Sequence, residues 1–385
     1  MKTETRVWTL DELILAEKVK LGRGNIISKK DIASFPGEFP IYSSAREKNG
    51  TFGYYGKYMF DEELITWSID GGGRLFYRPR HKFSVTNVGG TLRIIDTDFL
   101  DCRYLHLVLT HLHSKIRFDW VYKAHPSVIR TVYNEIPIPS LEKQCEIVKK
   151  LDSAFAEIDL LERNLELSDE RANHLLQSLL SASFANAAFR SESSHSAEDR
   201  ELAKKNEVLN DFTKVFTVIP DSKTKIKSSF YLESGKYAVV DQGKDLVAGY
   251  TNTAPTVNEN SLPVIVFGDH TRAVKYVDFP FTAGADGTQI LKPSPMTNPK
   301  YSFYLVLHAV SQIPSKGYAR HFGELRKMSF PLPSPERQNE IVEKLDSAFV
   351  EIELLKSQFR MKKDYAVALR RSLLSSAFSQ EEDVA

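Results

Sequence analysis

The chain has 385 residues, of which 42% are hydrophobic and 26% charged, and its formal net charge is +1. This length accommodates two or more domains with cores of their own, and the composition is ordinary for a globular protein. No run of about 18 apolar residues is present, which argues against a membrane span, and the first residues lack the apolar stretch of a secretory signal. The two cysteines, Cys102 and Cys145, have no metal-like spacing, so we expect reduced thiols in a cytoplasmic protein.

Charge is distributed unevenly along the chain. Residues 1–136 hold 20 basic against 16 acidic side chains, and residues 207–330 hold 14 against 11. The remaining segments hold 17 basic against 23 acidic side chains. Two mildly basic parts joined by acidic ones fit contact of the basic parts with nucleic acid, although so small an excess is weak evidence by itself.

The first basic part is predicted to be rich in β-structure. Residues 7–21 favour a short amphipathic helix or a strand followed by a helix, and residues 26–95 hold short β-type runs separated by turn signals. Gly71-Gly72-Gly73 has no helical pattern after it, so we interpret it as a hairpin turn and not as a nucleotide loop. Residues 96–118 then have the apolar spacing of a helix that packs on the sheet.

A long stretch of the chain occurs twice. Residues 137–184 align with residues 331–378 at an offset of 194, and 25 of the 48 paired positions are identical. Such similarity indicates an internal duplication. Each copy opens with Pro-x-Pro, which favours an extended exit from the preceding part, and Ser140 or Ser334 is then placed to cap a helix.

Beyond the cap, apolar residues recur every three or four positions for about five heptads, which predicts a coiled coil. The predicted seam consists of Ile147, Leu151, Ala154, Ile158, Leu161, Leu165, Ala172, Leu175 and Leu179, and of Ile341, Leu345, Ala348, Ile352, Leu355, Phe359, Ala366, Leu369 and Leu373. Ser168 and Lys362 are polar at the same seam position, where such a residue fixes the register or marks a break between two helices. The sequence leaves both alternatives open.

Further apolar positions exceed what a seam between two helices needs. They are Val148, Phe155, Leu160, Leu180, Val342, Phe349, Leu354 and Leu374. These side chains either complete the core around the helix pair or form a surface for another subunit, so we take them as candidate partner-binding residues.

The segment between the copies and the second basic part complete the duplication. Residues 185–206 are rich in Ser, Ala and charge and predict a flexible linker. In the part that follows, Gly249-Tyr250 corresponds to Gly53-Tyr54 at an offset of 196, and Gly287-Thr288 corresponds to Gly90-Thr91 at an offset of 197. Because a linker and not a tight turn joins the copies, we expect the two long helices to pack antiparallel.

A search for catalytic chemistry finds little. The chain has neither a phosphate-binding P-loop nor the Asn-Pro-Pro-aromatic or Asp-Pro-Pro-aromatic tetrapeptide of amino-methyltransferases. The aspartates within residues 96–101 and the His111-x-His113 pair lack a fitting third set of metal ligands, so charge at a helix end explains them better. Asp269-His270 could form a polar site but has no nucleophile or metal partner beside it. We therefore predict no catalytic residue and no metal site.

Binding chemistry is better represented than catalysis. Arginine can bond guanine, lysine can hold phosphate, and asparagine can bond adenine, so basic and polar loops are candidate DNA contacts, although each residue alone could be an ordinary solvated one. The candidates in the first part are Arg46, Lys48, Asn49, Arg74, Arg78, Arg80 and Lys82. Those in the second part are His270, Thr271, Arg272, Lys275, Lys316, Arg320 and His321.

The duplicated segment resembles a known family. Its Pro-x-Pro, Gln, Ile-Val and Leu-Asp pattern is similar to the conserved region of specificity subunits of type I restriction–modification enzymes. The matching positions are Pro137, Pro139, Gln144, Ile147, Val148, Leu151 and Asp152, and Pro331, Pro333, Gln338, Ile341, Val342, Leu345 and Asp346. The resemblance covers the whole chain apart from the linker and the tail.

The resemblance implies an α+β chain with an internal pseudo-two-fold repeat. Two β-rich α/β target-recognition domains would be separated by two long helices packed as an antiparallel coiled coil. The expected parts are residues 1–136 (first recognition domain), 137–184 (first helical region), 185–206 (linker), 207–330 (second recognition domain), 331–378 (second helical region) and 379–385 (tail).

The resemblance also implies a non-catalytic subunit that binds double-stranded DNA, each domain contacting one half of an asymmetric bipartite site. The helices would set the spacer and dock two methyltransferase subunits, and a motor-nuclease restriction subunit would complete the assembly. This chain would bind no cofactor; S-adenosylmethionine, ATP and Mg²⁺ would belong to the partners. The alternative is a coiled-coil scaffold with two ligand-binding heads and no DNA role. The sequence leaves open the bases recognised, the spacer length and whether the complex restricts or only methylates.

Overall fold

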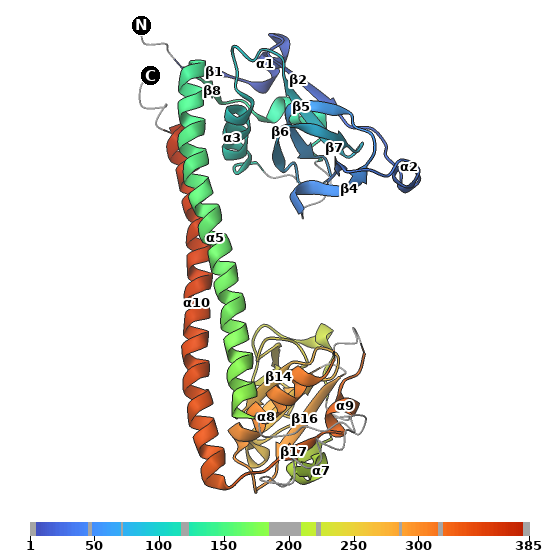
Figure 1. The fold of residues 1–385 in the computed structure, drawn as a ribbon, viewed down its shortest axis with the longest axis vertical. Coiled ribbons are helices and arrows are strands. Elements are labelled where there is room, and N and C mark those ends of the chain that lie inside the picture. The colour runs from blue at the N-terminus through green and yellow to red at the C-terminus, as the bar shows by residue number, and fades with distance from the viewer. Residues whose placement is uncertain are drawn as a thin grey trace. The chain divides into compact units, whose positions relative to one another are not determined.

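The computed structural model describes residues 5–44, 48–70, 72–116, 123–184, 209–220, 225–284, 287–314 and 319–379 (Figure 1). The chain divides into two compact units, residues 1–165 with 361–385 and residues 166–360. Each unit holds one globular domain and the adjoining parts of two long helices. The predicted linker at 185–206 and all but the first residue of the predicted tail lie outside the described residues.

Domain 1 is built on a six-stranded sheet with the order β2-β7-β5-β6-β3-β4. Neighbouring strands of this sheet pair antiparallel, except that β3 and β6 are parallel, with Ile41 opposite Ser84. The elements are β1 (Arg6–Trp8), α1 (Leu10–Leu15), β2 (Val19–Arg23), α2 (Lys29–Ser34), β3 (Phe39–Tyr42), η1 (Lys48–Gly50), β4 (Thr51–Tyr55), β5 (Phe60–Ser68), β6 (Leu75–Val85), β7 (Gly89–Ile94), α3 (Cys102–His113), α4 (Pro126–Val132) and β8 (Ile136–Ile138).

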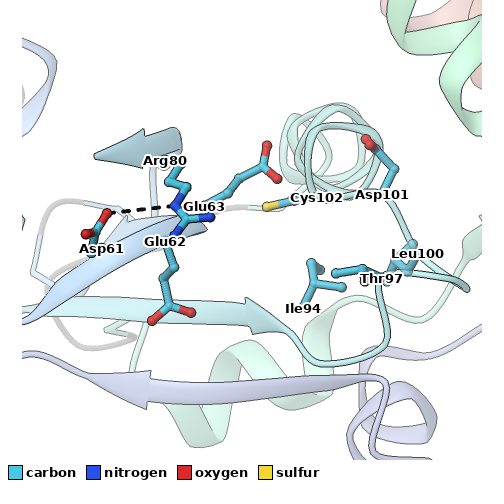
Figure 2. Close-up of a pocket in the computed structure, with 9 residues that line it drawn as sticks. All are labelled: Asp61, Glu62, Glu63, Arg80, Ile94, Thr97, Leu100, Asp101 and Cys102. Atoms are coloured by element: carbon cyan, nitrogen blue, oxygen red, sulfur yellow. Dashed lines mark ion pairs between the residues drawn. The ribbon is translucent and has the colours of Figure 1, made fainter. Parts of the chain in front are cut away.

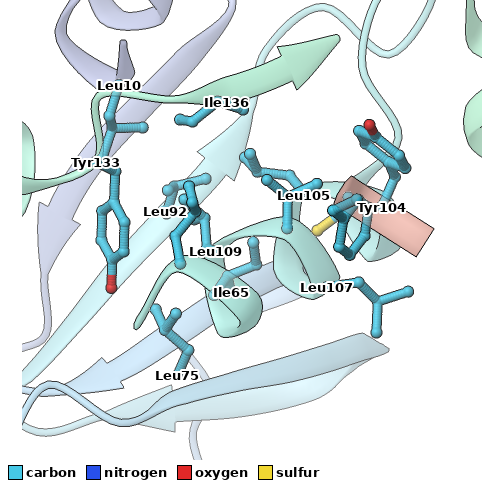
Figure 3. Packing of buried hydrophobic residues seen from close by; sticks show 14 of the residues in the cluster. Leu10, Ile65, Leu75, Leu92, Tyr104, Leu105, Leu107, Leu109, Tyr133 and Ile136 are labelled. Atoms are coloured by element: carbon cyan, nitrogen blue, oxygen red, sulfur yellow. The ribbon is translucent and has the colours of Figure 1, made fainter. Parts of the chain in front are cut away.

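The core of domain 1 lies between this sheet and α3 (Figure 3). Leu105 and Leu109 of the predicted helix are fully buried, as are Ile65 and Leu92 of the sheet. The Trp67 ring lies so close to Gly90 that a Cβ there would be 2.0 Å from it, which explains the glycine. The predicted hairpin is confirmed, because Gly72 and Gly73 have positive φ angles between the antiparallel strands β5 and β6.

Domain 2 repeats this topology with a broken sheet. Its strands form the orders β10-β16-β13-β14 and β12-β11-β15, so the short strands β14 and β15 stand where β6 is continuous. The elements are β9 (Leu209–Asp211), α7 (Phe212–Val215), β10 (Phe216–Ile219), η2 (Ser228–Phe230), β11 (Tyr237–Val240), β12 (Gly249–Thr251), η3 (Glu259–Ser261), β13 (Val264–Gly268), β14 (Val274–Val277), β15 (Phe281–Ala283), β16 (Thr288–Pro293), α8 (Pro299–Gln312), α9 (Phe322–Arg326) and β17 (Ser329–Pro331).

The strand pairings test the predicted correspondence between the domains. Gly53 pairs with Ile41 and Gly249 with Val239, so these glycines do occupy equivalent positions. In domain 1 Gly90 is opposite Trp67. In domain 2 the buried Phe267 takes the place of Trp67, and the residue opposite it is Gln289. The predicted match of Gly90 with Gly287 is therefore wrong by two residues. A shift of two keeps each side chain on the same face of a strand, which is why the sequence pattern did not show it.

Each domain closes on itself just before its long helix. β1 pairs antiparallel with β8, and β9 pairs with β17, so the extended Pro-x-Pro segments lie in small two-stranded sheets. The long helices are α5 (Leu141–Ser183) and α10 (Pro335–Ser379). Ser140 and Ser334 cap them as predicted, since their hydroxyls accept from the amides of Lys143 and Arg337, each at 3.4 Å.

Within each unit the two long helices pack antiparallel. In the first unit the beginning of α5, with Ile147 and Leu151, shares a buried cluster with the end of α10, including Phe378. In the second unit the end of α5, with Leu180, shares a cluster with Ile341 and Leu345 at the beginning of α10. Both helices continue through Ser168 and Lys362, so these positions do not end a helix. No helix in the described part of the chain combines the length and apolar character that crossing a bilayer requires.

The buried strip along the helices is narrower than the predicted seam. Leu161, Leu175 and Leu355 are 39%, 52% and 44% exposed, although each is a predicted seam position. Through the middle of α5 the buried apolar residues recur once in seven positions. The heptad position of Ile158, Leu165 and Ala172 therefore stays in contact, whereas the other seam position, with Leu161 and Leu175, lies at the margin of a contact that is one residue wide per heptad.

Candidate nucleic-acid interface

The exposed basic residues of domain 1 lie along β6 beyond its irregular pairing with β5. Arg80 has a side chain that is 78% exposed and a loose ion pair with Asp61 at 3.8 Å. Exposed Lys82 places its ammonium 4.9 Å from the centre of the Tyr58 ring. Arg74, at the beginning of the hairpin, is also exposed, with its guanidinium 5.3 Å from the Phe76 ring. These three cations are accessible to an external anion.

Arg78 differs from the other basic candidates because it is only 1% exposed. Its guanidinium donates to the Thr66 hydroxyl and to the Asn49 carbonyl, both at 2.9 Å, and lies 3.5 Å from the centre of the Tyr42 ring. Burial lowers the pKa of Arg78 to about 10. The prediction of Arg78 as a direct DNA contact therefore needs correction: the side chain supports the turn that carries Asn49, which is exposed with a φ of 55°.

Three further candidates cannot be placed in this way. Arg46 and Lys316 lie outside the described residues, as does the side chain of Lys48.

Exposed aromatic side chains, which were not among the residues predicted to bind DNA, gather at the β4 edge of the domain 1 sheet. Phe52 and Tyr54 on β4 are 48% and 59% exposed, and Tyr58 just after the strand is 47% exposed. Tyr250, at the position equivalent to Tyr54 in domain 2, is 37% exposed. The alternation Phe-Gly-Tyr in an edge strand was the available signal. Aromatic faces can stack on bases, while the neighbouring cations can contact phosphates.

In domain 2 the candidates that reach solvent are Thr271 and Arg320. The Thr271 hydroxyl donates to the Gln242 carbonyl, which holds the turn after β13. His270 in the same turn is half-buried, and its amide donates to the Gln242 side chain at 3.2 Å. Arg272 has a φ of 61° and directs its guanidinium to the Ile313 carbonyl at 2.8 Å.

Lys275 and His321 are buried, at 6% and 1% exposure, so the prediction that they contact DNA directly is also corrected. The Lys275 ammonium donates to the Asp241 carbonyl at 2.8 Å, and burial lowers its pKa. The amides of His321 and Phe322 donate to the Asp269 carboxylate at 2.8 and 2.7 Å. Asp269 thus anchors the beginning of α9.

A hollow of about 550 Å³ lies between β5, β6 and the start of α3 (Figure 2). Its carboxylates are engaged within the domain: Glu62 accepts from Arg93 at 2.8 Å, and Glu63 accepts from the Tyr77 hydroxyl. Asp101 caps α3 by accepting from the Tyr104 amide at 2.7 Å. Within the described ranges no group of three or more His, Cys, Asp or Glu side chains could hold a metal ion. Arg80 also lines the hollow, but the carboxylates outnumber its single positive charge, so the interior of the hollow is unfavourable for phosphate.

Most of the candidate partner-binding side chains pack against other residues of this chain. Leu160 and Leu354, at equivalent positions of α5 and α10, are 52% and 59% exposed. Four others are buried in the clusters around the helices, which corrects their assignment: Phe155, Leu180, Val342 and Leu374. Val148 and Phe349 are partly buried there, and their role in partner binding stays a prediction. Phe349, for example, packs on the Tyr304 ring with 4.9 Å between the centroids.

Comparison with known proteins identifies relatives over nearly the full length. The family model described as "Type I restriction modification DNA specificity domain" matches residues 9–167 and again residues 208–359. A Mycoplasma pneumoniae protein named "Putative type I specificity subunit S.MpnORF507P" is 26% identical over 362 residues, which cover 88% of this chain and 92% of the relative. The "Type I restriction enzyme MpnII specificity subunit" of the same organism is 38% identical over 161 residues, or 38% of this chain and 48% of that protein.

A solved structure also has this fold. A chain from a structure titled "Structural basis underlying complex assembly and conformational transition of the type I R-M system" aligns with a TM-score of 0.64. The alignment covers 98% of this chain and 99% of that chain, with 14% identical residues. At this identity the match establishes a common fold.

Proposed function

The chain belongs to the family of type I restriction–modification DNA specificity subunits, and we propose that each of its two domains contacts one half of an asymmetric bipartite site in double-stranded DNA. Members of this family supply the sequence specificity of the complex and not its catalytic chemistry. The observation that carries the proposal is the double match of the family model, once over each domain with part of its helix. Because the two domains differ in sequence, we expect two different half-sites, whereas symmetric dimers bind palindromes.

In domain 1 we place the DNA contacts at Asn49, Arg74, Arg80 and Lys82, with the aromatic side chain of Tyr54 beside them. All five are exposed. Arg78 acts behind this surface by holding the Asn49 carbonyl. Arg80 also lines the acidic hollow of Figure 2, so it marks the edge of the proposed contact surface on that side.

In domain 2 we place the contacts at Thr271 and Arg320, with His270 in the same turn as Thr271. Arg272 fastens this turn through its bond to Ile313. The buried Lys275 and the anchored start of α9 support the surface from behind. The domain boundaries proposed from the sequence, with recognition domains at 1–136 and 207–330, are retained.

For the partner subunits, we propose that the exposed Leu160 and Leu354 belong to docking sites for two methyltransferase subunits, one on each helix. The equivalence of these two positions at the offset of 194 supports two similar sites. S-adenosylmethionine, ATP and Mg²⁺ would be bound by the methyltransferase and motor-nuclease subunits. A scaffold without a DNA role is no longer a competing function, because the family is defined by DNA specificity.

The proposal is tested with the chain purified together with its methyltransferase subunits. We expect binding to a duplex that carries the target to weaken steeply with salt, because phosphate contacts release counterions. Sequencing of methylated positions in DNA exposed to the complex should give two different half-sites separated by unspecified base pairs. A continuous palindromic motif, or binding that does not respond to salt, would contradict the proposal.

A further inference from the structure

Two glutamines of the duplicated segment attach each domain to its long helix. Gln144 in the first turn of α5 has no exposed surface. Its side-chain NH₂ donates to the Pro139 carbonyl at 2.9 Å and to the Phe99 carbonyl at 3.0 Å. Its side-chain oxygen accepts from the Asp101 amide at 2.9 Å. One side chain thus joins the start of α5 to the loop before α3.

The second unit repeats this arrangement. Gln338 in the first turn of α10 is 2% exposed. Its NH₂ group donates to the Pro333 carbonyl at 2.9 Å and to the Met296 carbonyl at 3.4 Å. Its oxygen accepts from the Asn298 amide at 2.8 Å. Asn298 caps α8 as Asp101 caps α3, so each glutamine binds the N-cap residue of the equivalent helix in its own domain.

The hydrogen bonds described for both glutamine side chains go to main-chain atoms of the domains. Phe99 in domain 1 is replaced by Met296 in domain 2, and Asp101 by Asn298, yet the bonds to their carbonyls and amides persist. A bond to the main chain does not depend on the side chain of the domain residue. The attachment therefore persists when the side chains of the recognition domain change. Such changes are needed in the side chains that contact DNA, because they determine the sequence that is bound.

Two further contacts flank each glutamine, and in domain 1 they involve consecutive residues of α3. The Arg103 guanidinium donates to the Asp152 carboxylate of α5 at 2.5 and 3.0 Å. The Tyr104 hydroxyl donates to the Pro137 carbonyl at 2.8 Å. The bond to Pro137 fastens α3 to the strand that leads into α5, while Gln144 and Asp152 contact the domain at two places about two turns apart on the helix, which opposes both sliding and rotation of the domain on the helix.

Domain 2 has the same pair of flanking contacts in different chemical form. The Asp346 carboxylate of α10 pairs with the Lys300 ammonium at 2.6 Å and accepts from the Tyr304 hydroxyl at 2.5 Å. The Tyr301 hydroxyl donates to the Pro331 carbonyl at 3.1 Å. The carboxylate on the helix is constant, while its partners on the domain differ.

We propose that Gln144 and Gln338 are positioning residues that fix the number of unspecified base pairs between the half-sites, an inference that rests on the proposed function. Adding one base pair moves a half-site by about 3.4 Å along the duplex and rotates it by roughly 35° around the axis. A complex can reject such a site only if each domain is held against both movements. Helix length alone does not restrain rotation of a domain about its own helix, whereas the contacts of the glutamine and of the carboxylate two turns further along each helix do.

The test uses Gln144→Met in the complete complex with its methyltransferase subunits. Methionine keeps the length of the side chain and removes all three hydrogen bonds. The substrates are duplexes that carry the two half-sites mapped for the wild type, with the natural spacer or one to two base pairs added or removed. We expect the preference for the natural spacer to fall by about tenfold, which corresponds to about 1.4 kcal/mol, while the half-site bases stay unchanged.

Leu13→Ala is the control, because Leu13 is fully buried in domain 1 on α1 and the hydrogen bonds of the Gln144 side chain go to residues outside α1. It should lower stability and slow methylation of all spacers alike. If Gln144→Met gives no folded complex, Asp152→Asn carries the same test, with a smaller shift in the same direction. An unchanged spacer preference in a folded variant complex would overturn the inference. A contiguous site for the wild type would instead contradict the proposed function.

Discussion

Phe378 offers the sharpest test of the antiparallel arrangement of the helices. It lies in the last turns of α10, is 6% exposed, and packs on domain 1 through Tyr104 and His111, with ring centroids 5.9 and 5.8 Å away. Phe184, at the equivalent position of α5, packs in the same way on Tyr301 of domain 2, at 5.7 Å. Each domain is therefore covered by the end of the helix that follows the other domain.

We expect Phe378→Ala to destabilise the first unit by about 3 kcal/mol. Truncation of a buried phenylalanine costs about 3–5 kcal/mol, and the lower end applies because a helix terminus relaxes more easily than a core. Local opening of α3 should then become easier, and its amide hydrogens should exchange roughly a hundredfold faster. Hydrogen exchange measured by mass spectrometry on peptides from residues 102–113 detects this change, while peptides from residues 299–312 should stay as in the wild type.

Two further variants control this prediction. Phe184→Ala should give the opposite result, with faster exchange in α8 and unchanged exchange in α3. Val367→Ala on α10 should change neither, because Val367 is 55% exposed. If Phe378→Ala left α3 unchanged, or loosened α8 instead, the assignment of each helix end to its domain would be refuted.

Three more predictions concern pH, DNA and partner binding. Burial lowers the pKa of His106 to about 3 from 6.5, so between these values the unfolded chain binds a proton that the folded chain does not. The free energy of unfolding should therefore decrease as the pH is lowered through this window. His106→Gln should make this decrease smaller in denaturant titrations. Arg80→Ala should reduce the slope of log affinity for DNA against log salt by about 1, and Lys82→Ala likewise, while an unchanged slope would exclude a phosphate contact. Leu160→Asp should weaken binding of a methyltransferase subunit in calorimetry without altering the fold, and so should Leu354→Asp; full binding by both variants would remove the proposed docking sites.

The helical half of the protein was largely predictable from the sequence because its signals are local. The repeated Pro-x-Pro-Ser segment gave the strand exit and the caps at Ser140 and Ser334, and the apolar period gave two long helices. The exposure of Leu161 was not predictable, because the pattern shows that a residue is apolar but not how wide the contact between the two helices is.

The recognition domains were less predictable because their pairing is between residues far apart in the chain. The parallel pairing of β3 with β6 leaves no local signal, and the two-residue error at Gly90 preserved the apolar pattern. Arg78 and His321 were expected at the surface because such residues usually are. Their burial follows from tertiary contacts, with Asn49 and Asp269 respectively, that no spacing rule reveals.

The most direct test of the central claim is a comparison of methylated motifs between the wild-type complex and a complex that carries Arg80→Ala with Lys82→Ala. The account predicts that the bases of one half-site become degenerate or weakly methylated while the other half-site and the spacer stay as in the wild type. Equal loss of specificity in both half-sites, or none in either, would contradict the division of recognition between the two domains.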